Sequence, residues 1–202
     1  MSLRIQLYLL IFILLPSFNA TAAKQMEQEL DTATFSGGCF WCMEQPFDML
    51  PGVIKTIPGY TGGDTKHPTY KEVSSGTTGH VEAMQITYAP SVISYEKLLE
   101  VYWHNIDPTN GNGQFCDTGN QYRAGIFYHN EEQKRLAEQS KTLLEKNKKF
   151  TGSIMTFIAA ATEFYPAEDY HQNFSRKNPL TYKFYRFTCG RDNRLNELWG
   201  KR

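Results

Sequence analysis

Two cysteines in one short segment have the clearest chemical potential in this sequence. Residues 37–42 read Gly-Gly-Cys-Phe-Trp-Cys, with a strand predicted before the glycines and a helix predicted after them. Cys39 would therefore stand at a helix N-terminus, where unpaired amides and a partial positive charge stabilise a thiolate and lower the pKa of the thiol. This position predicts a reactive cysteine. A structural cysteine beside two core aromatic residues is the alternative.

Cys42 completes a C-x-x-C spacing, which serves several chemistries. A zinc site would need a second close pair of ligands, but Cys116 and Cys189 stand apart, so no metal is expected. Haem attachment would need histidine where the chain has Met43. Two further uses remain open. One is a redox dithiol, as in a thioredoxin-like disulfide oxidoreductase, and the other is a pair of structural disulfides, one within C-x-x-C and one between Cys116 and Cys189.

The strand predicted at 81–88 supplies a candidate acid. Side chains alternate along a strand, so Glu82 shares one face with Met84, Ile86 and Tyr88. Burial on that apolar face would raise the pKa of Glu82 and keep its carboxyl group protonated near neutral pH, ready to donate a proton. An exposed carboxylate at the end of a strand is the alternative.

Strands and helices mix along the chain without the strict rhythm of a parallel doubly wound sheet. Loops rich in Gly, Thr, Pro or Asn cover 59–79 and 106–122. This mixture favours a two-layer α+β sandwich with a mixed sheet. The predicted strands are 32–35, 53–60, 81–88, 124–128 and 153–160, and the predicted helices are 39–49, one capped by Ser94, one running from the capping pair Asn130 and Gln133 to about 148, and short pieces near 169–174 and 191–199.

Taken together, these motifs resemble the A-type peptide methionine sulfoxide reductases. The resemblance covers nearly all of the chain after its N-terminal segment, in the family's order, and implies a ferredoxin-like α+β domain with an irregular C-terminal segment. The matching segments are 37–41 (Gly-Gly-Cys-Phe-Trp), 59–63 (Gly-Tyr-Thr-Gly-Gly), 68–70 (Pro-Thr-Tyr), 79–83 (Gly-His-Val-Glu-Ala), Asp117, 121–123 (Gln-Tyr-Arg) and 165–172 (Tyr-Pro-Ala-Glu-Asp-Tyr-His-Gln).

The resemblance implies a role for each matched residue. Cys39 would attack the sulfoxide sulfur, and Glu82 would protonate the sulfoxide oxygen, which is a poor leaving group until it is protonated. Each reductase of this kind acts on one sulfoxide epimer, and here the resemblance implies the S epimer, free or in proteins. The implied substrate-binding residues are Phe40 and Trp41 for the methyl group, Tyr70 and Tyr122 for the oxygen, and Asp117 as a polar lining residue.

A sulfenic acid at Cys39 would need a second thiol to condense with it and release water. The family usually carries its resolving cysteine near the C-terminus, so the resemblance favours Cys189. The commoner family form has glycine at position 42, so this chain departs from it and Cys42 is the alternative, with Cys116 third. A thioredoxin-like dithiol protein would then reduce the intramolecular disulfide, and no cofactor is expected.

The first residues are predicted to form a targeting segment. Arg4 precedes an apolar run at 7–15, and small residues follow at 20–22, which is typical of a secretory signal peptide spanning 1–22. The run is too short to span a bilayer comfortably, although an uncleaved anchor is the alternative. Residues 23–202 would form one exported domain, periplasmic or secreted, without stable membrane insertion.

Bulk composition excludes some classes of partner. The chain has 21 basic and 21 acidic residues and a formal net charge of zero, so no charge imbalance indicates nucleic acid. We expect a monomer whose partners are oxidised proteins or free methionine sulfoxide, together with the thioredoxin-like reductant. The expected role is repair of oxidative damage in exported proteins.

Overall fold

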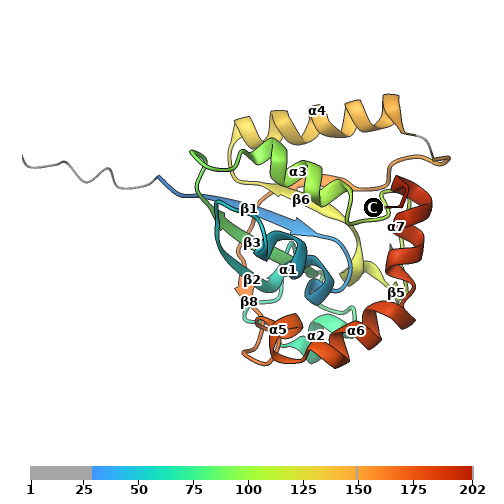
Figure 1. Ribbon diagram of the computed structural model, residues 1–202. Helices are drawn as coiled ribbons and strands as arrows, with labels where there is room; N and C mark the ends of the chain where they lie inside the picture. The colour runs from blue at the N-terminus through green and yellow to red at the C-terminus, as the bar shows by residue number, and fades with distance from the viewer. Residues whose placement is uncertain (1–28, 149, 202) are drawn as a thin grey trace, which may run out of the picture.

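A mixed β-sheet is the scaffold of this protein in the computed structural model, which describes residues 29–148 and 150–201 (Figure 1). Six strands form it: β1 (Asp31–Ser36), β2 (Val53–Thr61), β3 (Val81–Tyr88), β6 (Gly125–Tyr128), β7 (Phe157–Ala160) and β8 (Tyr165–Pro166). Their order across the sheet is β7-β6-β1-β3-β2-β8. Only the β6–β7 pair is parallel, and every other neighbouring pair in this sheet is antiparallel.

The central part of the sheet follows a ferredoxin-like path. Helix α1 (Phe40–Asp48) connects β1 to β2, and helix α3 (Tyr95–Trp103) connects β3 to β6. The chain therefore runs β-α-β-β-α-β, and the four strands lie in the order β6-β1-β3-β2. This arrangement confirms the predicted α+β class with a mixed sheet. No helix within the described ranges combines the length and apolar character that crossing a membrane requires.

The core lies between the sheet and the helices α1 and α3. Strand β3 alternates as predicted, because Met84, Ile86 and Tyr88 are buried in the main core with Phe35, while Val81 belongs to a second cluster on the opposite face. Full burial of one such side chain stabilises a fold by about 1.5–3 kcal/mol. The parity of β3 therefore fixes which face Glu82 shares.

Two helices begin at the caps that the sequence predicts. The hydroxyl of Ser94 accepts a hydrogen bond from the backbone of Lys97 at 3.3 Å. The side chain of Asn130 accepts one from the backbone of Gln133 at 2.8 Å and opens α4 (Glu131–Asn147), which packs on α3, β6 and β7. The side chain of Gln133 accepts a hydrogen bond from the backbone amide of His129 at 3.0 Å. A capping pair would place this second bond on the amide of Asn130, one residue later.

The predicted loops and the C-terminal segment contain more regular structure than the sequence indicates. Loop 59–79 includes α2 (Tyr70–Ser74), and loop 106–122 includes a hairpin of β4 (Gly113–Gln114) and β5 (Asp117–Thr118) followed by the 3-10 helix η1 (Asn120–Tyr122). After α5 (Phe174–Lys177), α6 (Pro179–Thr188) precedes the predicted α7 (Arg191–Trp199), and these helices follow the lower and right margins of Figure 1. Within α6 only Tyr182 is buried, and the helically spaced apolar residues Leu180, Phe184 and Phe187 are exposed, so the apolar stripe of this helix does not face the core.

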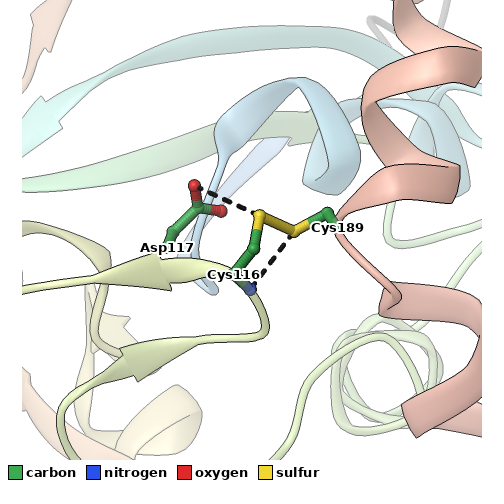
Figure 2. Close-up of side chains that lie close together, drawn as sticks. All are labelled: Cys116, Asp117 and Cys189. Carbon is green, nitrogen blue, oxygen red and sulfur yellow. Dashed lines mark hydrogen bonds between the residues drawn. A yellow bond between two sulfur atoms is a disulfide. The ribbon is translucent and has the colours of Figure 1, made fainter.

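A disulfide ties the β4–β5 hairpin to the junction of α6 and α7. Cys116 and Cys189 are bonded at a sequence separation of 73 (Figure 2). The backbone amide of Cys116 also donates a hydrogen bond to the sulfur of Cys189 at 3.2 Å. Cys39 and Cys42 are free thiols, so the structure contains only one of the two bridges in the structural-disulfide alternative.

We expect removal of this bridge to destabilise the fold. Closing a loop of this length restricts the unfolded chain, and native disulfides of this kind contribute about 2–4 kcal/mol. The double variant Cys116→Ala/Cys189→Ala should lose that amount in urea unfolding monitored by circular dichroism. The reduced wild-type protein should match the double variant. Equal free energies of unfolding for the oxidised wild type and the variant would contradict this prediction.

Candidate active site

One pocket collects every substrate-site residue that the sequence predicts. Its volume is about 310 Å³, and it opens beside the N-terminus of α1. Cys42 packs beside Cys39 in the cluster that underlies this pocket, whereas Cys189 is bonded to Cys116. The residues that line the pocket are Cys39, Phe40, Trp41, Tyr70, Glu82, Asp117, Tyr122 and Tyr185.

Backbone geometry presents Cys39 at the start of α1. Cys39 is the N-cap residue, and its carbonyl oxygen accepts hydrogen bonds from the amides of Cys42 and Met43. The preceding Gly38 has a φ of 79°, and a Cβ there would lie 2.6 Å from the Cβ of Gln114. Only glycine fits both that conformation and that close approach, so the break between β1 and α1 depends on it.

The pKa of Cys39 differs from the expectation. Burial, then the neighbouring Cys42, Glu82 and Asp117, raise the pKa of the Cys39 thiol well above its ordinary value. Hydrogen bonding from Cys39, helped by the charge of Arg191 and opposed by burial, lowers the pKa of Cys42 to about 7. The prediction that the helix N-terminus lowers the pKa of Cys39 is therefore wrong, because burial and its neighbours outweigh the helix end. Of the two thiols, Cys42 is the one whose ionisation the surroundings favour.

Glu82 lies beside the N-terminus of α1 and is buried, as the alternation of β3 predicts. It sits on β3 opposite Tyr60 of β2, and the residue is 2% exposed. The amide of Phe40 donates a hydrogen bond to its carboxyl group at 3.1 Å. Burial outweighs that bond and raises the pKa of Glu82 to about 8, so the group carries a proton at neutral pH. The expected burial of Glu82 is confirmed, and the direction of its pKa shift agrees with the expected protonated acid.

Aromatic side chains form the apolar wall of the pocket. Trp41 stacks on Phe174, with ring centres 3.7 Å apart and planes 6° apart. Its indole N–H donates to Nδ1 of His171 at 3.0 Å, which fixes the orientation of the indole ring. The His171 ring in turn lies 4.9 Å from that of Phe40. Phe174 and His171 therefore position the two predicted methyl-pocket residues.

The tyrosine side of the pocket comes from the two long loops. Tyr70 begins α2 and Tyr122 ends η1, and both residues are half-buried. Glu168 fixes Tyr70, because one carboxylate oxygen accepts from the Tyr70 amide at 2.8 Å and the other accepts from the hydroxyl of Tyr60 at 2.7 Å. Burial is the largest cause that raises the pKa of Tyr70 to about 12, so its phenol remains a hydrogen-bond donor.

Tyr185 is a pocket residue that the sequence does not reveal. Its hydroxyl lies 2.7 and 2.8 Å from the two carboxylate oxygens of Asp117 and donates to them. Burial is the main reason that the pKa of Asp117 is raised, and the bond from Tyr185 opposes that shift. Tyr185 belongs to α6, which the sequence does not predict, so no pattern placed this phenol near Asp117.

One cluster brings together atoms of the kinds that bind metals. The sulfurs of Cys116 and Cys189 and a carboxylate oxygen of Asp117 lie within 4.8 Å of one another (Figure 2). The two sulfurs are bonded to each other, so neither offers a thiolate to an ion in this state. The cluster is best described as a bridge beside the pocket.

A thiol pair at a helix N-terminus, facing a neutral carboxylic acid inside an aromatic pocket, suits chemistry in which sulfur is oxidised and oxygen is protonated. The scaffold that holds these groups is a ferredoxin-like sheet. Fold and site together define a thiol-dependent oxidoreductase.

Comparisons with known proteins narrow this class. The family model described as peptide methionine sulfoxide reductase matches residues 31–202. The peptide methionine sulfoxide reductase MsrA of Listeria monocytogenes is 56% identical over 173 residues, which cover 86% of this chain and 98% of that protein. The chain belongs to the peptide methionine sulfoxide reductase family, and its enzymatic class is that of the family.

Solved structures agree with this assignment. The reduced form of Mxr1 from Saccharomyces cerevisiae has a TM-score of 0.71 and 31% identity, covering 75% of this chain and 87% of that one. Mxr1 in complex with Trx2, from the same yeast, has a TM-score of 0.52 and 22% identity, covering 75% and 91%, which shows a shared fold.

Proposed function

We propose that this protein reduces the S epimer of methionine sulfoxide, free or in proteins, through a sulfenic acid on Cys39. The observation that carries the proposal is the pocket itself, where the Cys39 thiol and the protonated Glu82 line one cavity of about 310 Å³. Membership of the family supplies the substrate class. The S epimer is the one that the family resemblance implies, and a pocket with an acid, an aromatic wall and a nucleophile on different sides suits one handedness of a sulfoxide.

The chemical step uses these groups in order. Glu82 gives its proton to the sulfoxide oxygen, which turns that oxygen into a group that sulfur can release. Cys39 gives its thiol proton to a base and attacks the sulfoxide sulfur, and the oxygen passes to Cys39 as a sulfenic acid while methionine leaves. The sulfoxide loses its oxygen and is reduced by two electrons, and Cys39 is oxidised by the same two.

Binding depends on the aromatic and phenolic walls. Phe40 and Trp41 receive the methyl group, and the stack of Trp41 on Phe174 keeps this wall rigid. Tyr70 and Tyr122 line the same cavity as Glu82 and donate to the sulfoxide oxygen, and Asp117 also lines it as a polar group. These roles are those that the sequence predicts for each residue.

The sulfenic acid must then condense with a second thiol. Cys189 is the resolving residue predicted by resemblance, and Cys42 is the alternative. Cys189 is bonded to Cys116 in this structure, so it could act directly only after that bridge opens. Cys42 is a free thiol in the same cluster as Cys39. Trapping the oxidised enzyme after one turnover and mapping its disulfides by mass spectrometry distinguishes the two.

A thioredoxin-like dithiol protein is the proposed electron donor. It would exchange its dithiol for the intramolecular disulfide and return two thiols to the enzyme. Yeast Mxr1 has the same fold as this chain, and its structure in complex with Trx2 supports this type of recycling. We expect the enzyme to act as a monomer.

We also propose that the enzyme is exported and repairs exported proteins. The signal peptide predicted at 1–22 lies outside the described residues, so its support is the sequence pattern. The Cys116–Cys189 bridge adds to it, because disulfides persist in oxidising compartments such as the periplasm or the extracellular space. Mass measurement of the protein recovered from its host would show a chain beginning near residue 23.

The function is tested with separated epimers. Each sulfoxide epimer of a protected methionine is supplied with dithiothreitol as reductant, and methionine formation is followed by chromatography. We expect turnover of the S epimer alone. Reduction of an insulin disulfide without turnover of either epimer would instead support the disulfide oxidoreductase alternative for Cys39 and Cys42.

A further inference from the structure

A buried arginine lies beside the thiol pair. Arg191 begins α7, two residues after Cys189, and it is 1% exposed. Its Nη2 donates hydrogen bonds to the carbonyl oxygen of Gly37 at 3.0 Å and to that of Asn105 at 2.6 Å. The guanidinium carbon lies 4.4 Å from the centre of the Phe115 ring. These contacts hold the cation directly under the turn that leads into Cys39.

This cation has no carboxylate partner. None of the ion pairs found within 29–148 and 150–201 includes Arg191. A guanidinium keeps its charge in proteins, and an unpaired buried charge costs several kcal/mol unless nearby negative charge offsets it. Arg191 acts on two groups that can carry that charge, Cys42 and Asp117. An anion at either group would offset the charge of Arg191, and Cys42 is the one of the two that belongs to the thiol pair.

We propose that Cys42 is the resting thiolate of the site, that it accepts the proton of Cys39 as Cys39 attacks the sulfoxide, and that Arg191 is the positioning residue that stabilises this anion. The proposal rests on the proposed function, because it assigns the base for that reaction. It extends the role of Cys42 from resolving a sulfenic acid to activating the nucleophile that forms it.

The geometry of α1 supports this assignment. Cys42 lies in the first turn, its amide donates to the carbonyl oxygen of Cys39 at 3.0 Å, and the two thiols share one buried cluster with Tyr182. The N-terminal end of a helix favours negative charge in that turn. Hydrogen bonding from Cys39 and the charge of Arg191 lower the pKa of Cys42 to about 7, so the thiolate is populated at neutral pH.

Several charged or titratable groups from four other elements face Cys42. Arg191 and Arg186 favour its thiolate, whereas Asp117 disfavours it. The charge of Cys42 contributes to the raised pKa of Glu82. It contributes in the same way to the raised pKa values of the two α6 phenols, Tyr182 and Tyr185. The full set is Cys39 at the N-cap of α1, Glu82 of β3, Asp117 of β5, Tyr182, Tyr185 and Arg186 of α6, and Arg191 of α7.

Protons and electrons balance through the cycle. In the first step Glu82 gives one proton to the sulfoxide oxygen, and Cys42 takes one from Cys39 while Cys39 gains the oxygen as a sulfenic acid. In the second step the Cys42 thiol attacks the Cys39 sulfur, an S–S bond forms, and the hydroxyl leaves with the Cys42 proton as water. A dithiol reductant then supplies two electrons and two protons, one for Cys39 and one that returns to Glu82.

The Cys116–Cys189 bridge helps to hold the cation in place. Phe115, which the guanidinium covers, immediately precedes Cys116, and only Gly190 separates Cys189 from Arg191. The bridge therefore joins the two segments that meet at the cation. This gives the bridge a role at the site that does not require it to open during turnover.

The first test titrates Cys42 directly. In the Cys39→Ser background Cys42 is the one free thiol among the described residues, so the ultraviolet absorbance of its thiolate follows its ionisation. We expect Arg191→Met to raise the Cys42 pKa by about one unit or more, and Arg191→Lys to restore part of the shift. Arg135→Met, which removes an exposed arginine of α4, is the matched control and should leave the titration unchanged. The same Cys42 pKa in Arg191→Met and in the control would overturn the proposal.

The second test leaves Arg191 intact and measures the first turnover. Cys42→Ser should slow formation of the first equivalent of methionine by about a hundredfold or more at neutral pH, because general-base catalysis contributes roughly 10²–10⁴-fold. A residue that only resolved the sulfenic acid would leave this first turnover unchanged and block later ones, and that result would overturn the proposal. Failure of the proposed function is a separate outcome, in which wild-type enzyme forms no methionine from either epimer.

Discussion

Cys39→Ser is expected to abolish methionine formation, with kcat/KM at least about a thousandfold below the wild-type value. The hydroxyl of serine can occupy the same position at the start of α1, but its oxygen cannot be oxidised as sulfur can, so no acceptor remains for the sulfoxide oxygen. The measurement is turnover of the S epimer with dithiothreitol. A sulfenic acid reagent should label Cys39 in a Cys42→Ser protein and label nothing in Cys39→Ser.

This loss should occur without loss of the fold. Cys39 makes no side-chain cap bond to α1, and the isosteric replacement keeps the backbone contacts of its carbonyl oxygen. Unfolding in urea should therefore stay close to that of wild type, and Cys39→Ala should be as inactive as Cys39→Ser. Activity within tenfold of wild type in either variant would mean that a different thiol attacks the substrate.

Glu82→Gln is expected to lower kcat/KM by roughly 10²–10⁴-fold, the range that general acid catalysis contributes. Glutamine can still accept the bond from the Phe40 amide, but it has no proton to give to the sulfoxide oxygen. Since the pKa of Glu82 is about 8, wild-type activity should fall as pH rises above about 8. That alkaline limb should be missing from the residual activity of the variant. An unchanged limb in Glu82→Gln would assign it to another group.

Stability provides the control for this substitution. The folded protein holds the Glu82 proton up to about pH 8, whereas an unfolded chain releases it near pH 4, so the contribution of Glu82 to stability falls as pH rises between those values. Glu82→Gln should remove this decline and be relatively more stable at pH 8 than at pH 5, compared with wild type. The matched variant Glu138→Gln, on the exposed face of α4, should change neither activity nor this pH dependence.

Patterns local to one strand or helix were sufficient to predict much of this protein. Alternation in β3 placed Glu82 on the buried face, and the same burial gives its raised pKa. Ser94 and Asn130 predicted two helix starts because a cap bond depends on only three or four successive residues. Resemblance then named every residue of the pocket except Tyr185, and the structure brings the named residues together.

Features that depend on contacts between distant segments could not be predicted in this way. The pKa of Cys39 is set by burial and by groups on other elements, so its place at a helix end gave the wrong direction. The bridge from Cys116 to Cys189 crosses 73 positions and was one open alternative among several. Arg191 lies far along the chain from Gly37, and nothing in its neighbouring sequence indicates that it is buried.

The register of β3 decides which insertions and deletions this enzyme tolerates. Glu82 pairs with Tyr60, while its neighbours Val81 and Ala83 point to the opposite face, toward Phe127. Because parity alone assigns a side chain to a face, one residue added to or removed from the strand would turn the acid away from the thiols, whereas two would keep its side. Related chains should therefore differ in length in the 62–80 loop rather than within β3. Within β3 we expect substitutions but no single-residue insertions or deletions.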